Sequence, residues 1–64
     1  MKLTEQEKKA FELFAFRHNL SEICLIMGMS YQQGVNLMNK IVAKSPYKTE
    51  KELLANINSI EIEE

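Results

Sequence analysis

The chain has 64 residues with a formal net charge of −1, one His and one Cys, and 45% of its residues are hydrophobic. That length gives one small domain without room for a cofactor cleft. The single Cys and His cannot build a disulfide or a structural zinc site, and the chain shows neither an apolar run of ~20 residues nor a signal-peptide core. We therefore expect a globular protein of a reducing, cytoplasmic setting that is not an enzyme, holds no metal or cofactor and does not bind a membrane.

Four short patterns mark helix starts along the chain. Each pairs a Ser, Thr or Asn with a Glu or Gln three residues later, so that each side chain can satisfy a free backbone N–H of the other residue. The four patterns begin at Thr4, Asn19, Ser30 and Thr49. Because the spacing of these starts leaves room for a helix of ordinary length and a turn between each two, they favour an all-α fold.

Stop signals separate these starts. Residues 17–19 form a polar break, Gly28 lies where a helix end needs a left-handed residue, and Pro46 cannot continue a helix. The predicted helices span residues at about 5–17, 20–27, 31–44 and 50–58. Their apolar stripes predict a core that contains Ala10, Leu13, Phe14, Ile23, Cys24, Met27, Met38, Ile41, Val42, Leu53, Leu54 and Ile57. Arg17 continues the first stripe, and Phe11 lies one step beside it.

The end of the chain is acidic. Residues 60–63 alternate apolar and acidic side chains as an edge strand does, but fraying is the more common state of a terminus. We expect a helical domain over residues 1–58 and an acidic C-terminal tail over residues 59–64.

The second and third predicted helices are joined by a short turn at residues 28–30. A short helix, a tight glycine-containing turn and a longer helix are the layout of a helix-turn-helix, whose second helix enters the major groove of DNA. Gln and Asn can pair with adenine through two hydrogen bonds, and a helix start with a Ser suits a phosphate. The candidate DNA contacts are Ser30, Tyr31, Gln32, Gln33, Asn36, Lys40 and Lys44.

Three segments of the chain keep the spacing of a known family. L-T-E-Q-E at residues 3–7 is similar to L-T-x-R-E, E-I-C-L-I-M-G-M-S at 22–30 to E-I-A-x-x-L-G-I-S, and Lys48 with E-L-L at 52–54 to V-K-x-x-x-E-L-V. Over residues 3–54 the chain thus resembles the DNA-binding domain of LuxR-type regulators, which stands alone in GerE-like proteins.

The resemblance implies a four-helix LuxR/GerE-like bundle that regulates transcription and binds duplex DNA as a homodimer. In that family the fourth helix often supplies the dimer contact. The residues that would do so here are Leu53, Leu54, Ile57 and Ile60.

Several positions depart from the family. Six that are usually polar or charged there are apolar here, namely Phe16, Leu20, Leu25, Ile26, Val35 and Leu37. Gly34 replaces a core Val and should cost about 1 kcal/mol of helix stability relative to Ala. One interpretation is a divergent DNA binder with few phosphate contacts, and another places some of the six in the core.

A third interpretation is a protein-interaction module. Apolar residues gathered on one face mark interaction sites, and such a module would bind another transcription factor or the transcription machinery. Its face would contain Phe16, Leu25, Ile26, Val35 and Leu37.

Overall fold

A computed structural model describes residues 1–62. The described chain is all-helical, as the sequence predicts. Its elements are α1 (Glu5–Ala15), α2 (Leu20–Met27), α3 (Tyr31–Lys44), α4 (Glu50–Ala55) and the 3₁₀-helix η1 (Ile57–Ser59). None of these helices is long and apolar enough to cross a membrane.

All four predicted helix starts are confirmed. The first three carry the full reciprocal pair of side-chain hydrogen bonds, with Thr4, Asn19 and Ser30 as N-caps. The fourth carries half of it, because Thr49 Oγ1 accepts from the Glu52 N–H at 3.1 Å. The Glu52 carboxylate instead accepts from the Lys48 N–H at 3.5 Å.

Two predicted helix ends are wrong. Helix α1 ends at Ala15 rather than residue 17, because Arg17 adopts a left-handed conformation with a φ of 71°. Helix α4 ends at Ala55 rather than residue 58, and after Asn56 the chain tightens into the 3₁₀-helix η1.

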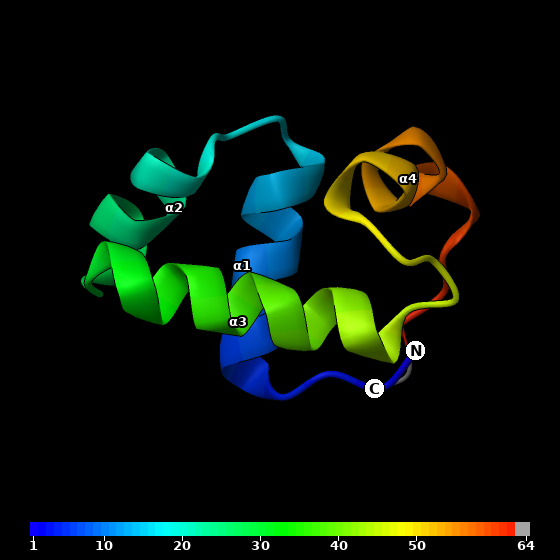
Figure 1. Ribbon diagram of the computed structural model, residues 1–64, viewed down its shortest axis with the longest axis horizontal. Coiled ribbons are helices and arrows are strands. Elements are labelled where there is room, and N and C mark those ends of the chain that lie inside the picture. The colour runs from blue at the N-terminus through cyan, green and yellow to red at the C-terminus, as the bar shows by residue number, and fades with distance from the viewer. Residues whose placement is uncertain (63–64) are drawn as a thin grey trace.

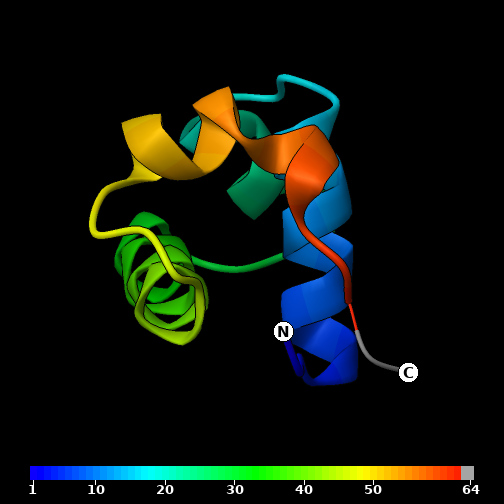
Figure 2. The same cartoon turned by 90° about the vertical axis from the view of Figure 1, so that its right-hand side faces the viewer.

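The core lies where helices from both halves of the chain meet. Helix α3 runs across α1, and α2 and α4 lie toward opposite ends of α3 (Figures 1 and 2). The buried hydrophobic residues are Leu3, Ala10, Phe11, Ile23, Cys24, Leu37, Met38, Ile41, Leu53 and Ile57. Leu3 was not in the predicted core, Phe11 was placed one step beside the first stripe, and Leu37 was one of the six departures for which a core position was left open. The predicted core residues that are only partly buried are Leu13, Phe14, Met27, Val42 and Leu54.

The described part of the C-terminal segment packs against the domain. Ile60 and Ile62 are partly buried against the core, and the N-terminal ammonium of Met1 donates to the Glu61 carbonyl oxygen at 2.8 Å. The expectation of a frayed tail is therefore wrong for residues 60–62, while residues 63 and 64 lie outside the described residues.

Candidate nucleic-acid interface

The turn between α2 and α3 is closed by a glycine. Gly28 is left-handed, with a φ of 67°. This conformation lets the Met29 N–H donate to the Cys24 carbonyl at 3.0 Å and the Gly28 N–H donate to the Leu25 carbonyl at 3.3 Å. The two hydrogen bonds satisfy the last carbonyls of α2. Ser30 then caps α3, so the second helix begins at once.

A second glycine lets α3 lie close to α2. A β-carbon added at Gly34 would stand 2.1 Å from the Cys24 Sγ atom and 3.3 Å from the Leu20 Cδ1 atom. No side chain fits there without a shift, which explains a glycine inside a helix. Cys24 is buried, as predicted. This contact fixes which side of α3 faces inward.

The side of α3 opposite Gly34 is polar. Gln32 and Asn36 are exposed, and their spacing of four residues puts them on one face of the helix. The Gln32 Nε2 atom donates to the Asn36 Oδ1 atom at 3.1 Å. Exposed Gln33 and Lys40 flank this pair, so four of the predicted DNA contacts lie side by side along α3.

A shallow groove of about 380 Å³ runs beside these residues. It is lined by Gln33, Asn36 and Lys40 from α3, by the end of α2 and by Gln6 from α1. No feature of the sequence indicated this role for Gln6, because nothing in it predicts that the first turn of α1 lies beside this groove.

Two predicted contacts have part of their hydrogen-bonding capacity occupied. The Ser30 Oγ atom accepts from the Gln33 N–H at 3.2 Å, and the Gln33 Oε1 atom accepts from the Ser30 N–H at 2.9 Å. The Ser30 hydroxyl proton and the Gln33 amide protons remain as donors. Tyr31, next in the chain, is exposed.

Lys44, a predicted phosphate contact, is exposed but is paired with a carboxylate of its own domain. Its Nζ atom lies 2.5 Å from the Oε1 atom of Glu7, which is only 4% exposed. Burial disfavours the Glu7 carboxylate, but the hydrogen bonds from Lys44 and Thr4 and the Lys44 charge outweigh it, so that the pKa of Glu7 is lowered. Lys44 therefore joins α3 to α1.

The predicted dimer face is largely inside the monomer. Leu53 is 0% exposed and Ile57 is also buried, so both belong to the core of this chain and not to an external contact. Leu54 and Ile60 are partly buried. Only these two remain from the predicted set.

The predicted apolar face is divided between core and surface. Leu37 is buried against the core and Val35 is half-buried, which removes Leu37 from any external face. By contrast, Phe16 is 78% exposed, Leu25 83% and Ile26 51%. Leu20, another of the six apolar departures, packs against the core.

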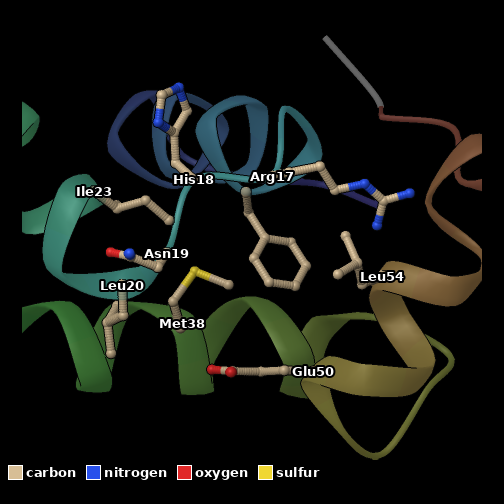
Figure 3. A pocket seen from close by; sticks show the side chains of 9 residues that line it. Arg17, His18, Asn19, Leu20, Ile23, Met38, Glu50 and Leu54 are labelled. Atoms are coloured by element: carbon tan, nitrogen blue, oxygen red, sulfur yellow. The ribbon is translucent and has the colours of Figure 1, made fainter.

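A second pocket lies at the corner between α1 and α2. It has a volume of about 290 Å³. Figure 3 shows Ile23, Met38 and Leu54 directed into one space from three helices, with Arg17 and Glu50 on opposite sides of it. Leu20 points from α2 toward α3 at the edge of this space. Nearby, the His18 Nδ1 atom lies 3.8 Å from the Glu22 Oε2 atom. Among residues 1–62, no three His, Cys, Asp or Glu side chains are grouped to hold a metal ion.

Comparisons of this chain with protein-family models, curated proteins and solved structures find no match. The assignment of a function therefore depends on the chemistry of these surfaces.

Proposed function

We propose that this chain is a small transcriptional regulator of the LuxR/GerE helix-turn-helix type, which binds duplex DNA as a dimer with α3 in the major groove. The observation that carries the proposal is the uncharged, amide-rich face of α3, directly after the tight turn at Gly28. Such a face offers hydrogen bonds to base edges with few charged groups to desolvate.

The paired amides of Gln32 and Asn36 suit an adenine. Their mutual hydrogen bond uses one Gln32 donor and the Asn36 carbonyl oxygen. The Gln32 Oε1 atom remains as an acceptor and the Asn36 Nδ2 group as a donor. An acceptor beside a donor complements the adenine edge, which presents the N6 amino group beside N7.

The phosphate contacts in this proposal are few. Lys40 is exposed on the flank of the amide face, and the Ser30 hydroxyl and the first N–H groups of α3 can donate to a phosphate oxygen. Because each neutralised phosphate contributes about −0.9 to the slope of log K against log salt, binding should depend only weakly on salt. Of the four residues proposed for the dimer contact, Leu54 and Ile60 are still partly exposed.

The test is an amide-shift titration with a short duplex at about 50 mM and about 200 mM salt, where non-specific binding of a DNA-binding protein has a Kd near 10⁻⁴–10⁻⁶ M. We expect shifts concentrated at residues 30–40 that weaken at the higher salt. Lys40→Glu should abolish binding without unfolding the protein. Lys51→Glu is the matched control, because Lys51 is an exposed lysine of α4. Unchanged affinity of Lys40→Glu would rule out this mode of binding.

A protein-interaction module is the second candidate. The exposed apolar side chains Phe16, Leu25 and Ile26 favour it, because apolar residues on the outer side of α2 offer nothing to a phosphate backbone. Its partner would be another transcription factor or the transcription machinery. Ile26→Lys should then remove partner binding while the protein stays folded, and a folded variant with unaltered partner affinity would count against this candidate.

A further inference from the structure

The pocket at the α1–α2 corner has an apolar floor supplied by all four helices. Phe14 comes from α1, Leu20 and Ile23 from α2, Met38 from α3 and Leu54 from α4. Its volume of about 290 Å³ lies near the lower end of the ~300–1,000 Å³ range of small-molecule sites. An occupant must therefore be small, with an apolar body.

The rim of this pocket carries the positive charge of Arg17, which has no ion-pair partner among residues 1–62. Within residues 1–62, Lys44 pairs with Glu7 and the His18 Nδ1 atom lies 3.8 Å from the Glu22 Oε2 atom, and Arg17 lies within ion-pair distance of no carboxylate. The Arg17 side chain lies above Leu54, on the side of the pocket opposite Glu50 (Figure 3). The first turn of α2, which also lines the pocket, adds the partial positive charge of a helix start.

The pocket also carries a negative charge, on Glu50 at the side opposite Arg17 (Figure 3). Glu50 is the first residue of α4, where a carboxylate is stabilised by the N–H groups of its own helix start. Within the described chain, the rim charge that has neither an ion-pair partner nor a helix start of its own is the Arg17 guanidinium. Guanidinium groups bind carboxylates through two parallel hydrogen bonds.

We propose that this pocket binds a small organic monocarboxylate, with its apolar chain on the floor and its carboxylate on Arg17. The ligand would contact Ile23 of α2 and Met38 of α3, and hence both helices of the candidate DNA interface. The proposal does not depend on DNA binding, because the ligand is tested without DNA.

The probe is hexanoate, added to the isotope-labelled full chain and followed by amide shifts. We expect saturable shifts at residues 17–23, 38 and 54, with a Kd on the order of 1 mM, which is what so few heavy atoms provide. Hexanol tests the chain without the charge and should bind about fivefold more weakly. Acetate tests the charge without the chain and should give no saturable shifts at these residues.

Arg17→Asn isolates the guanidinium, since asparagine tolerates the left-handed conformation of this position. We expect about fivefold weaker hexanoate binding and unchanged hexanol binding. Lys9→Asn is the matched control, an exposed cation of α1 outside the pocket. Glu50→Gln should strengthen hexanoate binding.

Three results would overturn the proposal. The first is the absence of saturable shifts at the pocket. The second is equal affinity for hexanol and hexanoate, which would mean that the pocket takes any apolar solute. The third is unchanged hexanoate binding by a folded Arg17→Asn variant.

Discussion

The two corners that flank α2 close their helices with the same hydrogen bonds but with different residues. At the end of α1, the His18 N–H donates to the Leu13 carbonyl and the Arg17 N–H to the Phe14 carbonyl, at 3.1 and 3.0 Å. The end of α2 repeats this pair around Gly28. Arg17 and Gly28 both have a positive φ, of 71° and 67°.

The corners differ in what surrounds them. After α2, the glycines at 28 and 34 allow a short turn and a close contact between α2 and α3. Before α2, a non-glycine residue accepts a conformation that costs about 1–2 kcal/mol, and the helices leave a pocket between them. The corner after α2, at Gly28 and Gly34, is therefore the closed corner, where two helices are in close contact. The corner before α2, at Arg17, is the open corner, where a charged side chain lies beside a pocket.

The largest effect is expected where the closed corner is tightest. Gly34→Ala places a β-carbon against the Cys24 Sγ atom, so it should lower the free energy of unfolding by about 2–3 kcal/mol. The better helix propensity of alanine offsets about 1 kcal/mol at most. Urea denaturation measures the change.

Cys24→Ala provides the matched test of that clash. Removal of the sulfur leaves the Cβ atom of residue 24 at 3.8 Å and the flexible Leu20 Cδ1 atom at 3.3 Å from the added carbon. The Cys24→Ala, Gly34→Ala double variant should therefore recover much of the lost stability. A double variant no better than Gly34→Ala alone would mean that the contact does not set the spacing of α2 and α3.

The ion pair between Lys44 and Glu7 includes no residue of either corner. The change in the free energy of unfolding on its loss can therefore be compared with the changes at the corners. Lys44→Met leaves the buried Glu7 carboxylate unpaired, which should lower the free energy of unfolding by about 1–3 kcal/mol at pH 7. Lys40→Met, at an exposed lysine without an ion pair in the described chain, should change it little.

The pH dependence of the same pair has a definite sign. Because the pKa of Glu7 is lowered in the folded protein from its ordinary value of 4.5, the stability from this shift is present above that value. It is lost as the pH falls through the lower, folded pKa. The difference between wild type and Lys44→Met should therefore shrink on acidification, as followed by urea denaturation at several pH values. A constant difference would contradict this account.

The sequence predicted the corner after α2 in detail, but for the corner before α2 it predicted the polar break and not the early end of α1, for a physical reason. Gly28 and the caps at Asn19 and Ser30 are local signals, since each acts within four residues of its own position. Arg17 is a good helix former, so the early end of α1 and its left-handed residue depend on how the following helix packs. Local signals do not contain that information.

The candidate site divides in the same way. Helical periodicity predicts the exposed face of α3. The structure confirms that Gln32, Asn36 and Lys40 are exposed. The pairing of Lys44 with Glu7, 37 residues away, and the burial of Leu53 and Ile57 depend on which helices meet. Periodicity identifies an apolar stripe but not whether it faces its own core or a second copy.

Gly28→Ala tests the closed corner at its backbone alone. Nothing lies within 4 Å of the added β-carbon, so the expected loss of about 1 kcal/mol in the free energy of unfolding comes only from the positive φ. Thermal or urea unfolding measures it. A loss as large as that of Gly34→Ala would show that strain and steric contact are not separable at this corner.

Arg17→Gly is the corresponding test at the open corner and has the smallest expected effect. Glycine relieves the left-handed strain but has more conformational freedom to lose on folding, so the free energy of unfolding should rise by only about 0.5 kcal/mol. Hexanoate binding should weaken at the same time, because the guanidinium is gone. A variant that is more stable but binds hexanoate less well would mean that the Arg17 side chain serves binding, although its left-handed backbone conformation lowers the stability of the fold. A less stable variant would instead mean that packing of the aliphatic part of Arg17, which extends beside the pocket (Figure 3), stabilises the protein by more than its backbone conformation destabilises it. Arg17 would then be explained by stability alone, without a role in binding.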